Sequence, residues 1–296
     1  LVRGTWLTGF GWGASAYAQV DGPLAAYAPW LGAYGLCALS AWLALTLAHQ
    51  WRSRRGGSWA ARVAALTAVL AVLVTPSLYD KLASPWSNST GRLSVTLLQG
   101  NIPQDEKFEI GSGVPQALQW YGEQLQASTS TLVIAPETAI PLLPQQLPAE
   151  YWGGLQQRFA SGQQAALVGT PLGDERLGYT NSVVAFKPGQ AQPWRYDKHH
   201  LVPFGEFIPP LFKWFTAMMN IPLGDFNRGA LVQPSFEWQG QRLAPNICYE
   251  NLFGEELAPN FLDPTLAPTI FVNVSNLGWF GNGLALDQHL QISRLR

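Results

Sequence analysis

The longest uncharged stretch of the sequence, APWLGAYGLCALSAWLALTLA, covers residues 28–48. A helix of about 20 residues is long enough to cross the hydrocarbon core of a bilayer. A second apolar stretch covers residues 59–79 and holds one charge, Arg62, close enough to its start for the side chain to reach the interface. Because neither stretch has a polar face, both are predicted to be transmembrane helices rather than a pair of buried helices in a soluble core.

The composition agrees with a membrane protein. Charged residues make up 12% of the chain, well below the roughly 25% that is usual in soluble globular proteins. The sequence also has 13 tryptophans, and these rings collect at membrane interfaces and in apolar binding surfaces. On composition alone, a Trp-rich soluble core remains an alternative. The net charge of −1 leaves no excess of Lys and Arg to neutralise phosphates, so no nucleic acid is expected as a partner.

The loop between the two apolar stretches, residues 49–58, is basic and contains Arg52, Arg54 and Arg55. Short loops rich in Arg tend to stay on the cytoplasmic side of a membrane. We therefore expect the chain after the second helix to lie on the other side, which in a bacterium is the periplasmic side of the inner membrane. Residues 80–91 are interpreted as a hinge between the membrane segments and the domain that follows.

From Arg92 onward, short β-rich runs alternate with longer amphipathic stretches, which is typical of an α/β domain. Strands are predicted for residues 93–99, 131–136, 165–170, 180–186, 242–247 and 269–275, and helices for residues 115–128, 149–161 and 250–260. Because the chain starts without Met and ends in a helical pattern, we expect a fragment. Residues 1–27 would be an interfacial segment or the end of an earlier span, and the domain of residues 92–296 would be incomplete at its C-terminal end.

Three reactive residues follow predicted strands or short extended segments, where α/β proteins place their sites: Glu137, Lys198 and Cys248. Taken singly, the Glu could cap a helix, the Lys could lie on the surface, and the Cys could be a small buried hydrophobe. Together they suit acyl transfer, in which a carboxylate takes the thiol proton, the thiolate attacks a carbonyl and an ammonium stabilises the oxyanion. A nearby Lys is also expected to lower the pKa of the Cys thiol.

The sequence around these residues reads IAPETAIP, YDKHHLVPFGEFIP, NICYENLFGE and NVSNLGWFG, after LLQGNIPQ. It resembles the apolipoprotein N-acyltransferase branch of the nitrilase superfamily over essentially the whole chain. The resemblance implies a nitrilase-like αββα sandwich preceded by transmembrane α-helices. It also implies that Glu137 is the general base, Lys198 the oxyanion and thiolate stabiliser, and Cys248 the nucleophile. Further residues implied in the active site are Glu206, Tyr249 and Glu250.

The same resemblance implies a ping-pong reaction in a bacterial inner membrane. Cys248 would take a fatty acyl chain from a membrane phospholipid and pass it to the α-amino group of the lipidated N-terminal cysteine of an apolipoprotein. Splitting the transfer through a thioester divides one difficult step into two easier ones. No cofactor is expected. No metal is expected either, because the four histidines are not spaced as zinc ligands are in zinc proteases.

An apolar segment follows the Lys motif over residues 203–224, and we call it the apolar arm. Such an arm would suit a lipid tail or the bilayer surface, and the alternative is a loop packed on the sandwich. Its large apolar side chains are Phe204, Phe207, Phe212, Trp214, Phe215, Met218 and Met219.

Other functions fit parts of the same pattern. A membrane-tethered amidase of the nitrilase type would hydrolyse a C–N bond with the same three residues and water as the acceptor. A non-catalytic binding module would not need Cys248 at all. Within the enzyme class, His199 or His200 could replace Glu137 as the base for the thiol, as in cysteine proteases.

Overall fold

The computed structural model describes residues 4, 6–52, 58–82, 89–209 and 226–296. The chain divides into two compact units. One unit comprises residues 1–91 and 284–296, and the other comprises residues 92–283. Each is described by itself.

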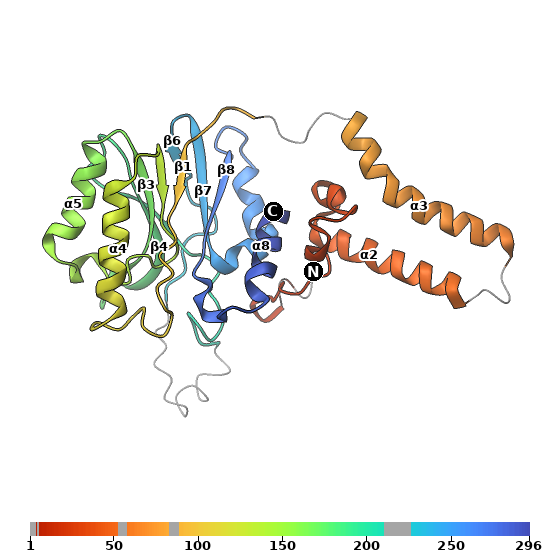
Figure 1. Ribbon diagram of the computed structural model, residues 1–296, viewed down its shortest axis with the longest axis horizontal. Helices are drawn as coiled ribbons and strands as arrows, with labels where there is room; N and C mark the ends of the chain where they lie inside the picture. The colour runs from red at the N-terminus through yellow and green to blue at the C-terminus, as the bar shows by residue number, and fades with distance from the viewer. Residues whose placement is uncertain (1–3, 5, 53–57, 83–88, 210–225) are drawn as a thin grey trace, which may run out of the picture. The chain divides into compact units, whose positions relative to one another are not determined.

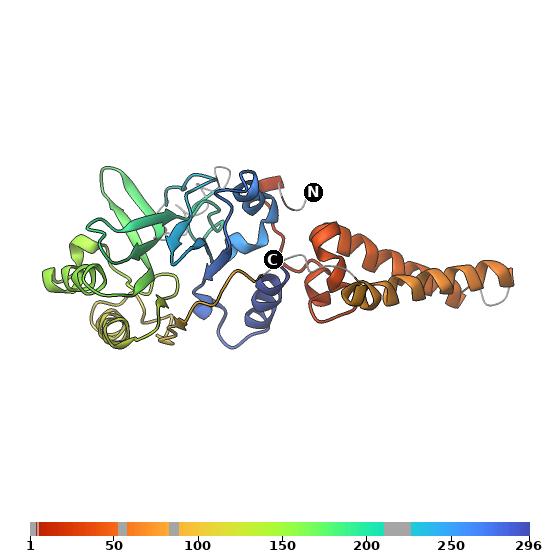
Figure 2. The same ribbon diagram turned by 90° about the horizontal axis from the view of Figure 1, so that it is seen from above.

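The first unit contains the two apolar helices that the sequence predicts, α2 (Ala28–Arg52) and α3 (Trp59–Leu82). Both are long and apolar enough to cross a membrane, over Ala25–Arg52 and Trp59–Pro76. Only 11% of each of these windows is buried inside the structure, which does not fit a pair of core helices in a soluble protein. The two helices run side by side in Figure 1 and in Figure 2, and Leu36 of α2 and Val69 of α3 belong to one apolar cluster.

The rest of this unit consists of short 3₁₀ turns and one amphipathic helix from the end of the chain. The turns are η1 (Trp6–Thr8), η2 (Tyr17–Gln19) and η3 (Ala25–Tyr27), and the helix is α8 (Ala285–Leu295). Arg294 of α8 forms a two-pronged ion pair with Asp21, at 3.0 and 2.5 Å. Trp12 donates its indole N–H to Gln288 at 2.7 Å. These contacts tie the last helix to the segment in front of α2.

The second unit is built on two β-sheets. The larger sheet has the order β1-β2-β3-β4-β5, parallel from β1 to β3 and antiparallel from β3 to β5. In the smaller sheet, β6 and β7 are antiparallel and β7 and β8 are parallel. The strands are β1 (Val95–Leu97), β2 (Leu132–Ile134), β3 (Ala165–Asp174), β4 (Gly178–Phe186), β5 (Trp194–Asp197), β6 (Phe236–Trp238), β7 (Gln241–Ile247) and β8 (Ile270–Val274).

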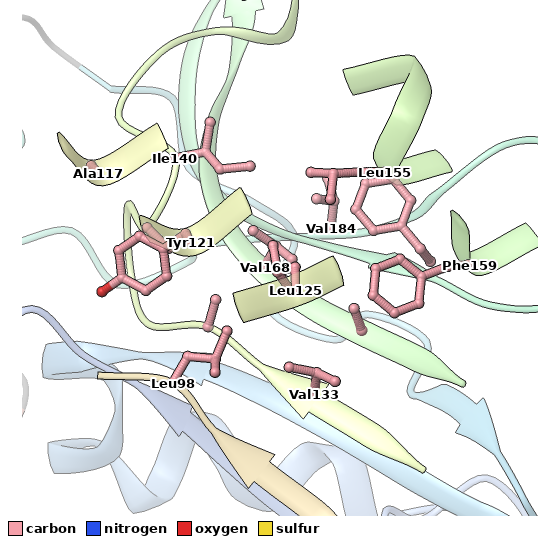
Figure 3. Close-up of a cluster of buried hydrophobic side chains, with 14 of the residues drawn as sticks. Leu98, Ala117, Tyr121, Leu125, Val133, Ile140, Leu155, Phe159, Val168 and Val184 are labelled. Carbon is pink, nitrogen blue, oxygen red and sulfur yellow. The ribbon is translucent and has the colours of Figure 1, made fainter. Parts of the chain in front are cut away.

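The larger sheet is buried on both faces. Successive side chains of a strand point to opposite faces, and both faces of this sheet are covered by apolar clusters. Val133 points into a cluster with the helices α4 (Gly113–Ala127) and α5 (Ala149–Ala160), shown in Figure 3. The neighbouring Leu132 and Ile134 belong to a second cluster, which they share with the smaller sheet. The two sheets therefore pack face to face, with α4 and α5 on the outer side of the larger one.

The outer face of the smaller sheet carries the segment that follows Cys248. This segment consists of η7 (Cys248–Leu252), α7 (Gly254–Leu257) and η8 (Ala258–Phe261). Val272 of β8 points toward the larger sheet, so its neighbour Phe271 points away. The ring of Phe271 meets that of Phe261 edge-on at 5.5 Å. The order of layers is helical, sheet, sheet, helical, which is the expected α/β fold (Figure 1).

All six predicted strands and the first two predicted helices are confirmed. The third predicted helix, residues 250–260, is wrong in kind, because it consists of 3₁₀ turns around the four residues of α7. Pro259 lacks an N–H for a helical ladder, and the segment starts from a left-handed backbone at Cys248. Strands β5 and β6 were not predicted; their four and three residues are too few for a clear alternation.

Candidate active site

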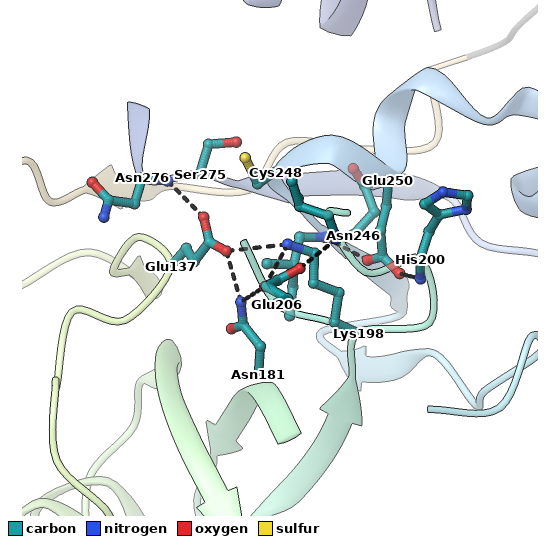
Figure 4. A network of polar contacts seen from close by, with 12 residues as sticks. Glu137, Asn181, Lys198, His200, Glu206, Asn246, Cys248, Glu250, Ser275 and Asn276 are labelled. Carbon is teal, nitrogen blue, oxygen red and sulfur yellow. Dashed lines mark hydrogen bonds and ion pairs between the residues drawn. The ribbon is translucent and has the colours of Figure 1, made fainter. Parts of the chain in front are cut away.

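The structure brings the three predicted reactive residues together from three different strands (Figure 4). Glu137 follows β2, Lys198 follows β5 and Cys248 follows β7. The Lys198 ammonium lies 3.3 Å from Glu137 Oε1. Cys248 interacts electrostatically with both of these charges. The carboxylate and the ammonium follow strands of the larger sheet, and the thiol follows a strand of the smaller sheet, so the site depends on the packing of the two sheets.

Two non-glycine residues of the site have a left-handed backbone. Cys248 has a φ of 50° and Thr138, directly after the Glu, has a φ of 48°. Such a conformation costs about 1–3 kcal/mol, and strain of this kind collects at functional sites. At Cys248 it turns the chain sharply from β7 into η7. The thiol therefore sits at a bend rather than in the regular alternation of the strand.

The carboxylate of Glu137 is buried and satisfied at both oxygens. Oε1 accepts from the side-chain amide of Asn181 at 2.7 Å, besides its contact with Lys198. Oε2 accepts from the backbone N–H of Asn276 at 2.8 Å. Burial alone would raise the pKa of Glu137, but Lys198 and these hydrogen bonds lower it below its ordinary value. The group is therefore ionised at neutral pH, as a general base must be.

Glu206 is a second carboxylate on the same ammonium. Its Oε1 lies 2.9 Å from Lys198 Nζ and accepts from Asn181 Nδ2 at 2.7 Å. Its Oε2 accepts from the backbone N–H of Val202 at 2.8 Å. Burial lowers the pKa of Lys198, but the charges of Glu137 and Glu206 outweigh it and raise the pKa above its ordinary value. Lys198 therefore keeps its proton.

The thiol of Cys248 corrects one expectation from the sequence. Its pKa is raised, not lowered, because burial and the charge of Glu137 outweigh the opposing effect of Lys198. One ammonium next to two carboxylates does not create a positive environment for the sulfur. The thiol therefore stays protonated at rest and needs a base at the moment of attack.

Glu250 lies behind the reacting groups and binds the Cys248 and Lys198 loops together. Its Oε2 accepts from the backbone N–H of Ile247 at 2.6 Å and from the hydroxyl of Tyr196 at 2.9 Å. Its Oε1 accepts from the backbone N–H groups of the two histidines after Lys198, at 2.7 and 3.1 Å. Burial raises the pKa of Glu250. Tyr249 is also buried and meets Phe253 edge-on at 5.1 Å.

The side chains of His199 and His200 contact groups other than the thiol of Cys248. His199 Nδ1 lies 2.8 Å from the carbonyl oxygen of Gly229. His200 Nδ1 lies 2.9 Å from the carboxylate of Glu256, and its ring stacks on Phe253 with the centroids 3.5 Å apart. Figure 4 shows the ring of His200 turned away from the thiol of Cys248. This geometry favours Glu137 as the base.

Sequence reasoning missed three residues that touch the base: Asn181, Asn276 and Lys107. Asn276 lies within NVSNLGWFG and Lys107 lies just after LLQGNIPQ. Their place in or next to these motifs could have marked Asn276 and Lys107 as candidates. The neighbouring residues in sequence do not indicate that the two groups reach Glu137. Among the described residues, no group of three or more His, Cys, Asp or Glu could hold a metal ion.

Only the start of the apolar arm is described. Phe204 is exposed, with a φ of 62°, and its backbone N–H bonds the carbonyl of Phe207 at 2.8 Å. The guanidinium of Arg228 lies 4.9 Å from the centre of the Phe207 ring. The remaining large side chains of the arm lie outside the described residues: Phe212, Trp214, Phe215, Met218 and Met219.

Comparison with known proteins gives two family matches. The model of the carbon-nitrogen hydrolase family matches residues 94–296. The model of the apolipoprotein N-acyltransferase N-terminal domain matches residues 1–46. The first therefore covers the whole second unit from β1 onward, with every residue of the site.

Curated relatives match over the full length of the chain. The apolipoprotein N-acyltransferase of Verminephrobacter eiseniae is 57% identical over 303 residues, which cover 100% of this chain and 56% of that protein. The apolipoprotein N-acyltransferase of Ralstonia nicotianae is 45% identical, over 100% of this chain and 55% of that protein. The chain thus spans about half the length of the relatives it matches. Among solved structures, an amidase from Nesterenkonia sp. matches at a TM-score of 0.46 and 14% identity, over 69% of this chain and 72% of that one.

Proposed function

The chain belongs to the carbon-nitrogen hydrolase family, and from this premise we propose that it forms the catalytic part of an apolipoprotein N-acyltransferase. The observation that carries the proposal is the 57% identity, over the whole chain, to a protein of that name. A site with a base, an ammonium and a thiol, preceded by two helices that could cross a membrane, supports it.

In the first half-reaction, Cys248 attacks the ester carbonyl of a membrane phospholipid. Glu137, which is ionised, takes the thiol proton as the sulfur bonds to the carbonyl carbon. Lys198, which stays protonated, stabilises the negative charge on the sulfur and on the carbonyl oxygen. The ester C–O bond breaks, the leaving oxygen takes the proton from Glu137, and a lysophospholipid departs from an acyl-Cys248 thioester.

In the second half-reaction, the α-amino group of the diacylglyceryl-modified N-terminal cysteine of an apolipoprotein attacks the thioester. The C–N bond forms, the C–S bond breaks, and the proton lost by the amine returns to the sulfur through Glu137. The raised pKa of Cys248 suits this step, because the thiol holds its proton again once the amide has formed.

The mass of Cys248 tests this proposal directly. Full-length protein incubated with phospholipid vesicles should carry a fatty acyl adduct on Cys248, released by hydroxylamine and visible by intact and peptide mass spectrometry. Cys248→Ala should lose the adduct. Cys37→Ala is the matched control, because Cys37 is the other cysteine of the sequence and lies in α2. Lys198→Ala should lose the adduct and His199→Gln should keep it; the reverse pattern would favour the histidine base.

The acceptor decides between the transferase and an amidase. The acyl-enzyme should persist in water and disappear when a diacylglyceryl-modified peptide with a free N-terminal amine is added. A peptide with an acetylated N-terminus is the control and should leave it intact. Rapid hydrolysis in water alone, with turnover of a soluble amide, would replace the proposal by an amidase of the same family.

For the membrane, we propose that α2 and α3 span a bacterial inner membrane. The loop of residues 49–58 would be cytoplasmic, and the domain starting at residue 92 would be periplasmic. Labelling with a membrane-impermeant maleimide tests this, in a background that lacks both cysteines. Glu175→Cys, in an exposed turn between β3 and β4, should react in intact spheroplasts. Ser58→Cys should react only after lysis, and the opposite pattern would invert the topology.

A further inference from the structure

Lys107 is a buried ammonium that the reaction described above does not use. It follows β1 and is 5% exposed. Its Nζ donates to the carbonyl oxygen of Glu137 at 3.2 Å. A buried lysine needs a partner to offset its lost hydration. Here the partner is the main chain of the general base, and the carboxylate of the same residue adds its charge.

The loop that carries Lys107 is held from both ends. Toward α4, a Cβ on Gly113 would stand 2.2 Å from the carbonyl oxygen of Glu106 and 2.9 Å from Lys107 Cα, so the loop folds onto the start of that helix only with glycine there. Toward β1, Gln104 Oε1 accepts from the side chain of Asn276 at 2.8 Å. The backbone N–H of that same asparagine donates to Glu137 Oε2.

This one loop therefore contacts the main-chain carbonyl of Glu137 directly and its carboxylate through Asn276. Through Asn276 it orders the carboxylate, and through Lys107 it fixes the carbonyl next to Thr138. Thr138 has a left-handed backbone, with a φ of 48°. A donor on the preceding carbonyl helps to hold this turn, and the turn aims the Glu137 side chain at Lys198 and Cys248.

The charges of the site also call for a second cation. Lys198 lies within 3.3 Å of two carboxylates, those of Glu137 and Glu206. One ammonium between these two carboxylates leaves an excess of negative charge next to Glu137, which Lys107 reduces. Lys107 adds to the effects of Lys198 and the hydrogen bonds that lower the pKa of Glu137, so its loss should raise that pKa.

We propose that Lys107 is a positioning residue for the base: its ammonium holds the turn that carries Glu137 and supplies a second positive charge that favours the ionised carboxylate. This inference rests on the acyl transfer proposed above. It gives Lys107 no contact with substrate and assigns it no proton transfer.

The loss of the Lys107 charge with rising pH gives a way to test this role. Burial lowers the pKa of Lys107 to about 8, against the opposing charge of Glu137. Glu137, after β2, is the charged group that faces it, and Lys198 and Glu206 lie beyond that carboxylate. Lys107 therefore loses its charge as the pH rises through about 8. An arginine at this position would keep its charge, since the guanidinium does not deprotonate in proteins.

The experiment is the pH dependence of Cys248 acylation in a single turnover, in full-length protein with phospholipid vesicles, between about pH 3 and 10, so that the range includes the acidic limb set by Glu137. Lys107→Met should slow acylation by about tenfold at neutral pH, where one pKa unit and a tenfold change are equivalent, because the turn that carries Glu137 loses its donor. The lost positive charge should also move the acidic limb to higher pH, by up to about one unit. In the unmodified protein, acylation should decline above pH 8, because Lys107 loses its charge there and its hydrogen bond to the turn weakens. Lys107→Arg should restore the rate and abolish this expected decline.

A matched control exists in β4's extension. Lys187 Nζ also donates to a glutamate carbonyl at the same 3.2 Å and lies over a phenylalanine ring, but the carbonyl is that of Glu237 in β6 and not that of the base. Lys187→Met should change neither limb. Thermal unfolding of each variant separates a folding defect from a kinetic one.

Three outcomes would overturn the inference. They are an unchanged rate and acidic limb in folded Lys107→Met, a uniform loss of rate with no shift of that limb, or a decline above pH 8 in Lys107→Arg like that of the unmodified protein. The arginine comparison decides the question even if the methionine variant does not fold. If the unmodified protein forms no adduct, the proposed function has failed, and this is distinct from every result above.

Discussion

Gly169 of β3 lies directly against the backbone of Glu137. A Cβ at position 169 would stand 2.7 Å from Glu137 Cα and 2.2 Å from the carbonyl oxygen of Pro136. Non-bonded carbon atoms prefer a separation of about 3.5–4.0 Å, so no side chain fits without moving the base. The position of the Glu137 carboxylate therefore depends on a glycine, which has no side chain, at position 169 of the neighbouring strand.

Gly169→Ala should damage both stability and chemistry, because the methyl group must push β2 and the turn after it away from β3. We expect a loss of about 1–3 kcal/mol in the free energy of unfolding, as for other overpacked sites, and a fall in Cys248 acylation of at least about tenfold. Gly153→Ala in α5 is the control. No atom lies within 4 Å of its Cβ, and it should stabilise the helix by about 0.5–1 kcal/mol. Thermal melts and single-turnover acylation measure both variants. A melting temperature of Gly169→Ala equal to that of the unmodified protein would refute the steric argument.

Glu250→Gln should unfold the loops around the site rather than alter the chemistry alone. Four donors now share the two carboxylate oxygens of Glu250. A glutamine side chain offers only one acceptor oxygen, and its NH₂ group would face donors that it cannot accept from. Leaving a buried donor unsatisfied costs about 1–3 kcal/mol, so a lower melting temperature is expected. Tyr196→Phe removes one of the four donors and should cost less. Denaturant unfolding measures both, with the exposed Glu175→Gln as a neutral control. A wild-type melting curve for Glu250→Gln, with lost acylation, would instead mean a direct catalytic role.

The reactivity of Cys248 should change with the charges around it in a definite direction. Removing the negative charge in Glu137→Gln should lower the pKa of the thiol, because that charge raises it. Removing the positive charge in Lys198→Met should raise the pKa further. The rate of iodoacetamide alkylation against pH, in a Cys37→Ala background, reports the thiolate fraction. Glu137→Gln should thus be alkylated faster at pH 8 although its acylation is lost. Slower alkylation would mean that the carboxylate favours the thiolate at rest.

Asn181 links the two carboxylates of the site, and a charge there should be harmful. Its Nδ2 donates to Glu137 Oε1 and Glu206 Oε1, and its Oδ1 has no partner among the described residues. Asn181→Asp would put a third carboxylate between them and raise the pKa of Glu137. The base would then be protonated over a wider acidic range, so the acidic limb of the acylation profile should move to higher pH by about one unit or more.

Two further variants sharpen this test of Asn181. Asn181→Ala removes the donor but adds no charge, so its shift should be smaller than that of the aspartate. Asn260→Asp is the control, since Asn260 donates only to the backbone carbonyl of Leu257 at 3.0 Å in the described structure. If Asn181→Asp leaves the acidic limb in place while the protein stays folded, Asn181 does not influence the base.

Much of the fold could be predicted because its signals are local. The apolar stretches of residues 28–48 and 59–79 are long enough to be recognised from length and charge alone, and they form α2 and α3. The alternation of Leu132, Val133 and Ile134 between two apolar clusters follows from the period of a strand. The hairpin of β3 and β4 extends further than predicted, because its register continues through turn-like residues to the pair Asp174 and Gly178.

By itself, the sequence determined the two long apolar helices, six of the eight strands, the helices α4 and α5, and the chemistry that Glu137, Lys198 and Cys248 allow as a set. Only the tertiary structure decided how these groups share charge. The shared ammonium, the raised pKa of the thiol and the approach of Lys107 all depend on distances between segments far apart in the chain. Hydrophobic periodicity and helix length act between neighbours in sequence, whereas electrostatic energy and burial depend on separations in space, which exist only once the two sheets have packed.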